Sequence, residues 1–212
     1  MATQRDERSP LGDHQRRRSN RAAETRRTLL SAARDVFTER GFAEASVVEV
    51  VERARSSIAS VYHHFGGKNE LYLALWEEYQ SSQEGRAATA VTATRLAGED
   101  DPASLFIAGT RAFLAGSWES RDLVRLFFDG DGPAGFELVR RRRSREWVRQ
   151  NAVLLHAEDK PVDRVMVVIL TTMVGELGRE VASCESPDEV RTLIDAAAGF
   201  VHRLWSVSPH AG

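Results

Sequence analysis

Residues 56–71 read SSIASVYHHFGGKNEL, and this stretch decides the fold. Small and hydroxylated residues lead into a run of aromatic side chains and histidines, which two glycines end before a lysine. Adjacent residues of a helix point about 100° apart, so His63 and His64 cannot readily bind one metal ion together. The stretch therefore predicts a short helix over residues 58–65 that ends at Gly66 and Gly67, without a metal site.

Two further helices are predicted before this one. Apolar residues recur at helical spacing from Glu24 onward, at Leu29, Ala33, Val36 and Phe37. Gly41 can then supply the left-handed residue that ends the helix. Ser46 is followed three residues later by Glu49, which is the pattern of a capping box at the start of a second helix. Three helices, the last two short and closely linked, are expected of a helix-turn-helix unit.

Length and composition exclude several classes of protein. A chain of 212 residues with 42% hydrophobic and 28% charged residues is typical of a globular protein of one domain or two small ones. The single cysteine, Cys184, excludes an internal disulfide and a four-cysteine zinc site, and favours a reducing, cytoplasmic compartment. The longest apolar run, residues 165–170, is far shorter than the roughly 20 residues that cross a bilayer. The charged N-terminus has no apolar signal core, so neither export nor a membrane partner is expected.

The charges are distributed unevenly along the chain. Residues 1–68 contain 13 Lys and Arg against 9 Asp and Glu, a formal charge of +4, although the whole chain carries −2. The remaining residues therefore carry −6. Such an asymmetry predicts a basic working end on a more acidic body.

The N-terminal third resembles the tetracycline-repressor (TetR) family of bacterial transcriptional regulators. The residues that carry the resemblance are TRRTLLSAARDVFTERGFAEASVVEV at 25–50 and SVYHHFGGKNELYLAL at 60–75. They follow the family's order of an apolar first helix, a glycine-aromatic cap, a capped second helix, a recognition helix ending in Tyr-x-His-Phe, and a lysine that opens the fourth helix. The chain departs from the family in the turn at 54–60, ARSSIAS, where Arg55 and Ala59 replace glycines and Ser56 replaces a buried valine. Arg55 would be strained if this turn needs a positive φ, and Ser56 would need a hydrogen-bond partner if it is buried.

The resemblance implies a set of DNA-contacting residues. The start of the recognition helix would approach base edges in the major groove, and its candidates are Ser57, Ile58, Ala59 and Ser60. The candidates for contacts to phosphates, sugars and base methyl groups are Tyr62, His63 and His64, although Tyr62 could also be a half-buried packing residue. Ser46 and Lys68, at the starts of the second and fourth helices, would contact flanking phosphates, and Arg55 would add a charge beside them. Val61 and Phe65 are interpreted as core.

The remainder of the chain is predicted to be helical as well. No alternating β pattern occurs after residue 69, and the breaks between segments predict about six helices there, one starting at Asp101 with Pro102 and another at Ser186 with Glu189. The expected fold is thus all-α, with a disordered basic arm at 1–22, a helix-turn-helix domain at 23–68, and a helical domain at 69–212 that the resemblance assigns to effector binding and dimerisation. Arg16 to Arg18 of the arm are either a solvated tail or a contact to phosphates.

The dimer interface is expected on the last two helices. Residues 162–181 are apolar nearly all round, which is typical of a helix buried between its own core and a partner subunit. Residues 188–205 repeat apolar side chains at helical spacing, and together the two segments could form an intersubunit four-helix bundle. The candidate interface residues are Val165, Val168, Ile169, Val190, Leu193, Ile194, Ala197, Phe200 and Val201.

Aromatic residues of the middle helices could line an effector cavity, which is usually apolar, or could simply fill a core. They are Phe106, Phe113, Trp118, Phe127, Phe128 and Trp147. The loop at 127–136 could be a pocket lid or a plain connection. The four arginines at 140–143 surround most of a helix, and are interpreted as a solvated face with ion pairs, with an anionic ligand or a second nucleic-acid contact as the alternative.

The resemblance implies a homodimeric regulator that binds a near-palindromic site in double-stranded DNA. We expect a repressor that a small, largely apolar effector of unknown identity releases from its operator. No catalytic residues are identified, because no nucleophile-base pair and no metal-ligand spacing is legible, and no cofactor is expected. A DNA-binding architectural or recruiting factor without an effector remains the alternative.

Overall fold

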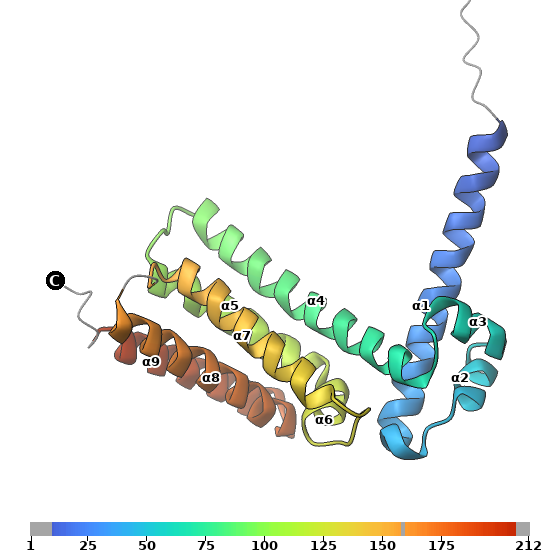
Figure 1. Ribbon diagram of the computed structural model, residues 1–212. Helices are drawn as coiled ribbons and strands as arrows, with labels where there is room; N and C mark the ends of the chain where they lie inside the picture. Colours follow the sequence, from blue (N-terminus) through green and yellow to red (C-terminus); the bar gives the residue numbers. More distant parts are fainter. Residues whose placement is uncertain (1–9, 158–159, 207–212) are drawn as a thin grey trace, which may run out of the picture.

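The protein begins with a three-helix unit from which one long helix leads away. The computed structural model describes residues 10–157 and 160–206, and every regular element in those residues is an α-helix. The unit consists of α1 (Pro10–Glu44), α2 (Val47–Arg53) and α3 (Ile58–His64), and α4 (Lys68–Leu96) connects it to the rest of the chain (Figure 1). The predicted all-α fold with an N-terminal helix-turn-helix is confirmed.

Six helices, α4 to α9, follow the unit, as the breaks in the sequence predict. The remaining bounds are α5 (Pro102–Glu119), α6 (Arg121–Phe128), α7 (Phe136–Leu154), α8 (Pro161–Ser183) and α9 (Pro187–Ser206). Helix α5 packs against α4, α8 and α9, and α8 and α9 lie together on the side of the molecule away from α4 (Figure 1). Among the described helices, none combines the length and the apolar character needed to cross a membrane.

Local sequence signals explain where several helices begin and end. Ser46 Oγ accepts from the Glu49 amide at 3.1 Å and Glu49 Oε2 accepts from the Ser46 amide at 3.0 Å, which completes the predicted capping box. Asp101 caps α5 by accepting from the Ser104 amide. Gly41 has φ 76°, as expected of the residue that ends the regular part of α1.

The prediction of a disordered arm over residues 1–22 is wrong for residues 10–22. These residues continue α1 as one helix with the three-helix unit, and residues 1–9 lie outside the described part of the chain. Arginine, glutamine and alanine are good helix formers. A helix already fixed by the buried side chains of Leu29 and Leu30 can therefore extend through them without a new nucleation step.

The core of the three-helix unit continues into the following helices. Phe37, Val61 and Tyr72 are fully or almost fully buried, and the same cluster of side chains includes Trp76 of α4 and Phe127 of α6. Tyr72 makes edge-on ring contacts with Phe37 at 5.3 Å and with Phe127 at 5.3 Å. The predicted boundary at residue 68 is therefore crossed both by α4 and by a continuous core, which ties the position of the first unit to α6.

Candidate functional site

Helix α3 presents large side chains to solvent on one face. Ile58 is 46% exposed and Tyr62 is 59% exposed, whereas Val61 on the opposite face is completely buried. Ser57 begins the helix, because its Oγ accepts from the Ser60 amide at 3.2 Å. Ala59 and His63 are also exposed. Ile58, Ala59, Tyr62 and His63 therefore share one accessible face, whereas Ser60 and His64 are half-buried and Val61 is in the core.

The turn before α3 contains the residue that replaces the family's glycine. Arg55 has φ 48°, a left-handed conformation that costs energy for a residue with a Cβ. Ser56 is half-buried, so its hydroxyl is less enclosed than the buried valine of the family. The guanidinium of the neighbouring Arg53 donates to both carboxylate oxygens of Glu39 at 2.7 and 2.8 Å, which ties α2 to α1. Arg55 therefore has the positive φ at which the sequence predicts strain.

Lys68 and the two histidines flank this face. Lys68 Nζ donates to the carbonyl oxygen of Ala43 at 3.0 Å and lies 4.6 Å from the centre of the Phe42 ring. It therefore caps the C-terminal end of α1, a role that the sequence did not indicate. His63 is exposed, His64 is half-buried, and their ring centres are 5.1 Å apart. Within the described residues, no three His, Cys, Asp or Glu side chains come together in a group that could hold a metal ion.

Two acidic side chains of α6 and the following turn hold the three-helix unit in place. Asp122 accepts from Nε and Nη2 of Arg34 at 2.7 Å each. Burial opposes ionisation of Asp122, but the Arg34 guanidinium outweighs it and lowers the pKa of the carboxyl. Asp131 accepts from the amides of Phe42 and Ala43 at 3.1 and 3.0 Å. Both contacts link the α6 region to α1.

A buried tyrosine completes this junction. The Tyr72 hydroxyl lies 3.3 Å from the carbonyl oxygens of both Leu126 and Asp131, so it can donate to either. Burial raises the pKa of the Tyr72 phenol well above its usual range. The hydroxyl therefore stays protonated and remains a hydrogen-bond donor at the end of α6.

The body contains a cavity of about 640 Å³ between α4, α5, α7 and α8. Four of the six predicted aromatic residues line it, namely Phe106, Phe113, Phe128 and Trp147. Phe127 fills the core instead, the other alternative for these residues, because it is completely buried against Trp76 and Tyr72. Trp118 is not part of the cavity lining either, and its ring lies under the Arg121 guanidinium at 4.4 Å. Helical spacing alone could not separate the cavity face of α5 and α6 from the core face.

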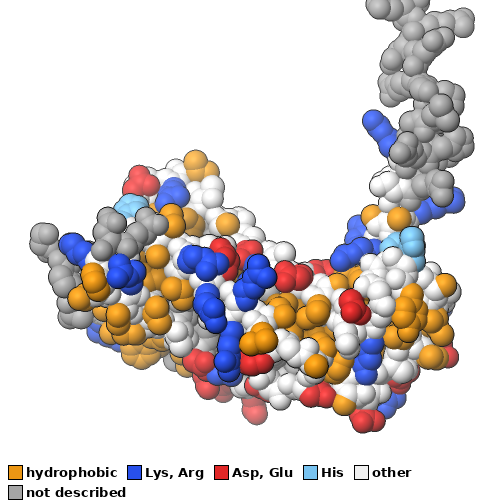
Figure 2. Space-filling model, in the orientation of Figure 1, with side chains coloured by type: hydrophobic (Ala, Val, Ile, Leu, Met, Phe, Trp, Pro, Cys, Tyr) orange, Lys and Arg blue, Asp and Glu red, His pale blue; other side chains and the backbone are white. Residues whose placement is uncertain are grey.

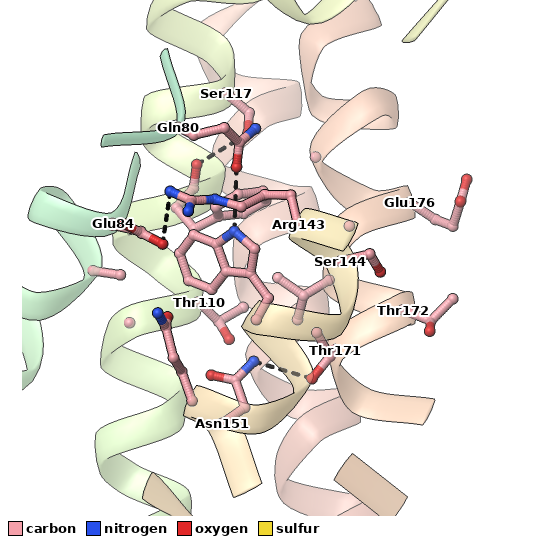
Figure 3. Close-up of a pocket in the computed structure, with 18 of the residues that line it drawn as sticks. Gln80, Glu84, Thr110, Ser117, Arg143, Ser144, Asn151, Thr171, Thr172 and Glu176 are labelled. Carbon is pink, nitrogen blue, oxygen red and sulfur yellow. Dashed lines mark hydrogen bonds and ion pairs between the residues drawn. The ribbon is translucent and has the colours of Figure 1, made fainter. Parts of the chain in front are cut away.

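Polar side chains form part of the cavity wall, and they were not predicted from the sequence. Figure 3 shows Arg143 of α7 reaching across the cavity to Glu84 of α4, with 2.8 Å between Nη2 and Oε1. Trp147 Nε1 donates to Gln80 Oε1 at 3.2 Å. Asn151 Nδ2 donates to Thr171 Oγ1 at 3.0 Å. One signal in the sequence could have revealed this wall, because Gln80 and Glu84 lie four residues apart and so share one face of α4.

The arginines at 140–143 do not form a single solvated face. Basic side chains gather over α7 on the face shown in Figure 2. Arg141 and Arg142 are exposed, but Arg140 and Arg143 are half-buried, and both of them line the cavity. Arg140 Nη1 donates to the carbonyl oxygen of Phe127 at 2.7 Å, so it also holds the last turn of α6.

The predicted dimer residues divide between an exposed face and the core. Val165, Val168 and Ile169 of α8 are 58, 47 and 47% exposed, and Phe200 of α9 is 44% exposed. Leu193 and Ile194 are half-buried. The prediction is wrong for Val190, Ala197 and Val201, which are buried within the chain because α9 packs its apolar stripe against α5 and α8.

The family model described as "Bacterial regulatory proteins, tetR family" matches residues 29–75. The transcriptional activator FasR of Mycolicibacterium smegmatis is 41% identical over 80 residues, which are 37% of this chain and 36% of FasR. The transcriptional repressor AcnR of Corynebacterium efficiens is 39% identical over 54 residues, 26% of this chain and 29% of AcnR. The chain thus spans about a third of the length of these relatives. Both are transcription regulators by name.

Solved structures share the fold over most of the chain. A TetR-like transcriptional regulator from Rhodococcus sp. RHA1 has a TM-score of 0.63 at 23% identity, over 87% of this chain and 97% of that one. AibR, solved in complex with isovaleryl coenzyme A and operator DNA, has a TM-score of 0.58 at 16% identity, over 83% of this chain and 97% of AibR. At these identities the likeness establishes the fold alone, including that of the C-terminal body, which the family model does not reach.

Proposed function

We propose that the chain is a member of the TetR family, whose model matches residues 29–75, and that it is a homodimeric, sequence-specific DNA-binding regulator that a small effector releases from its operator. The observation that carries the DNA-binding part is the exposed face of α3. Ile58 and Tyr62 expose about half of their surface, whereas the other large apolar side chains of the three-helix unit are mostly buried. A short helix with a serine cap and small residues at its start can approach base edges closely in the major groove.

Individual residues of this face have distinct roles in the proposal. Ile58 makes apolar contact with a thymine methyl group, and the hydroxyls of Ser57 and Ser60 can bond to base edges. Tyr62 and the histidines contact phosphates and sugars. The free amides at the N-termini of α2 and α4 favour anions, so flanking phosphates lie near Ser46 and Lys68.

The proposed regulator acts as a dimer, because a near-palindromic site is bound by two three-helix units, each with its own α3. Half-sites lie about one DNA turn, roughly 34 Å, apart. The apolar residues of α8 and α9 that solvent reaches, Val165, Val168, Ile169 and Phe200, support an interface on this side of the body. The arrangement would hold the two α3 helices at a fixed separation, which is the quantity that an effector can change.

The cavity supports an effector over an architectural role without one. Its volume falls within the roughly 300–1,000 Å³ of small-molecule sites, and aromatic side chains line much of it. AibR, which shares the fold, holds both a small molecule and operator DNA in its solved complex. In the proposal, a bound effector favours one arrangement of α6 and α7. The change reaches DNA through Asp122 and Asp131, and it is limited to the difference in effector affinity between the two arrangements.

Selection of DNA duplexes by the purified protein tests the DNA-binding part. We expect enrichment of a near-palindromic sequence, which can then be measured by fluorescence anisotropy. The Tyr62→Ala variant should bind it about tenfold or more weakly, since a hydrogen bond to a charged group contributes about 1.5–3 kcal/mol. Leu96→Ala serves as the control, because Leu96 is 85% exposed at the far end of α4. Absence of any enriched sequence, or an unchanged affinity of Tyr62→Ala, would count against the proposal.

A further inference from the structure

The cavity has a charged end and an apolar end. Helix α7 runs along it, and its first turns place Arg140 and Arg143 near α6. The opposite end contains no charged residue and is lined mainly by Ala87 and Val91 of α4, Phe106 of α5 and Leu154 of α7, beside the hydrogen-bonded pair Asn151 and Thr171. The cavity therefore matches a molecule with one polar group at the end of an apolar body.

The ion pair at the charged end leaves hydrogen-bonding capacity unused. Arg143 and Glu84 keep only 21 and 29% of their side chains exposed. Their closest atoms are 2.8 Å apart but are not aligned as a hydrogen bond, and Arg143 Nε is buried without an acceptor. Glu84 Oε1 is likewise buried without a donor. Both groups are costly to leave unsatisfied, so the ion pair alone suits a ligand that accepts from Arg143 or one that donates to Glu84, and the surrounding charges decide between the two.

The charges around the cavity favour an anion over a cation. Four arginines line it, Arg140, Arg141, Arg143 and Arg179, against the three glutamates Glu84, Glu137 and Glu176. Glu137 is shared between Arg140 and Arg141, and Glu176 pairs with Arg179. Glu84 alone faces Arg143. One positive charge is therefore in excess, on Arg140 and Arg141, and Arg140 lies one turn before Arg143 on α7. A guanidinium binds carboxylate or phosphate oxygens through two parallel bonds.

We propose that the effector is an amphipathic anion, whose carboxylate or phosphate binds Arg143 while its apolar body lies along Phe113 and Trp147 toward Phe106 and Leu154. This assignment rests on the proposed function and specifies the chemical class of its effector. Trp147 and Phe113 meet edge-on at 5.9 Å, and they form the apolar wall next to the charged end. Arg140, which lines the cavity beside Arg143 and holds the carbonyl of Phe127, places the anionic group next to the end of α6.

Three probes with the same tail test the class of ligand. Decanoate, decanol and decyltrimethylammonium differ in charge but share a ten-carbon chain, and their binding is measured by calorimetry and thermal shift. We expect decanoate to bind about tenfold or more tightly than either of the others. Decyl phosphate serves as a fourth probe, and tighter binding of either anion supports the proposal and identifies the anionic group.

Two reciprocal variants test the role of Arg143. Arg143→Gln should weaken decanoate binding about tenfold or more, because a hydrogen-bonded charge partner is lost. Glu84→Gln should leave decanoate binding unchanged or tighter, because the competing carboxylate is removed. A cation-binding site would show the opposite order for decyltrimethylammonium. If Arg143→Gln does not fold, Arg143→Lys and Glu84→Gln are compared instead. Lysine keeps the positive charge, so Arg143→Lys should still bind decanoate more tightly than decanol, and weaker decanoate binding by Glu84→Gln would contradict the proposal.

Different experimental results would contradict the anionic class of the effector and the proposed function. If decanol or decyltrimethylammonium binds and releases the selected duplex while both anions do not, the anionic class is wrong and the effector mechanism is supported. If decanoate binds and Arg143→Gln binds it equally well, the assignment of Arg143 is wrong. If no probe binds, the inference is overturned, whereas DNA binding by the protein is measured independently with the selected duplex.

Discussion

Arg55 holds the turn between α2 and α3 in a conformation that suits glycine better. Its φ of 48° places the backbone in the left-handed region, where the Cβ of a non-glycine residue costs roughly 1–2 kcal/mol. Glycine at this position would remove that cost. Its larger conformational entropy in the unfolded chain would offset part of the gain in stability. We expect Arg55→Gly to stabilise the protein by about 0.5–1 kcal/mol, which corresponds to a rise in Tm of roughly 1–4 °C.

The Arg55→Ala variant separates backbone strain from charge. Alanine removes the guanidinium but keeps the Cβ, so its Tm should stay within about 1 °C of the parent protein. If Arg55 contacts a phosphate, both variants should lose DNA affinity equally and show a shallower salt dependence. Calorimetric melting and binding at two salt concentrations supply both measurements. An equal rise in Tm for the two variants would show that strain at φ is not the cause.

The turn after α6 links the C-terminal helices to the three-helix unit, and in the proposed function it transmits effector binding to α3. Asp131 in this turn accepts from the amides of Phe42 and Ala43, at the end of α1. Removing its carboxylate in Asp131→Ala takes away two charge-assisted hydrogen bonds, each contributing about 1.5–3 kcal/mol. We expect the amides of residues 42 and 43 to exchange with solvent at least about fivefold faster, as followed by hydrogen–deuterium exchange.

Asp129→Ala is the matched control for this element. Asp129 precedes Asp131 by two residues, carries the same charge and is exposed, and its carboxylate acts electrostatically on Arg179 of α8. Exchange at residues 42 and 43 should be unchanged in this variant. Equal exchange in the two variants would mean that Asp131 does not hold the end of α1, and that the path from α6 runs through Arg34 and Asp122 alone.

At the level of elements, signals between neighbouring residues were sufficient to predict much of the fold. The capping box at Ser46 and Glu49, the glycine at 41 and the cap at Asp101 act within one turn of backbone, so their outcome does not depend on distant packing. The roles of Lys68 and Asp131 could not be predicted in this way. Both depend on contacts with α1 that are far away in the sequence.

The residues that line the cavity and the exposed apolar residues of α8 and α9 were predicted only in part, for a related reason. Helical spacing identifies an apolar stripe but not which neighbour covers it. Phe127 and Phe128 are adjacent, yet one is completely buried and the other lines the cavity. Val201 and Phe200 differ in the same way, since α5 and α8 cover the first and solvent reaches the second. Tertiary packing decides these cases.

For the whole molecule, the proposed dimer depends on the exposed apolar residues of α8, because this interface would hold the two α3 helices together. Ile169 is 47% exposed, and it lies near Val165 and Val168 on the same helix. A glutamate in the centre of a buried dimer interface would remain without a partner, which strongly opposes association. Because the side chain is half-exposed in the single chain, the fold of the monomer should tolerate the same change.

We therefore expect Ile169→Glu to shift the protein from dimer to monomer in analytical ultracentrifugation, with a Tm change of only a few degrees. Affinity for the full palindromic duplex should fall about 10²-fold or more, because the second three-helix unit is no longer tethered, while affinity for a half-site duplex should stay the same. Val153→Glu is the matched control, since Val153 is 59% exposed on α7, outside the α8 and α9 face. A variant at Ile169 that remains dimeric would place the interface elsewhere, and the separation of the two α3 helices would then have to be set by other contacts.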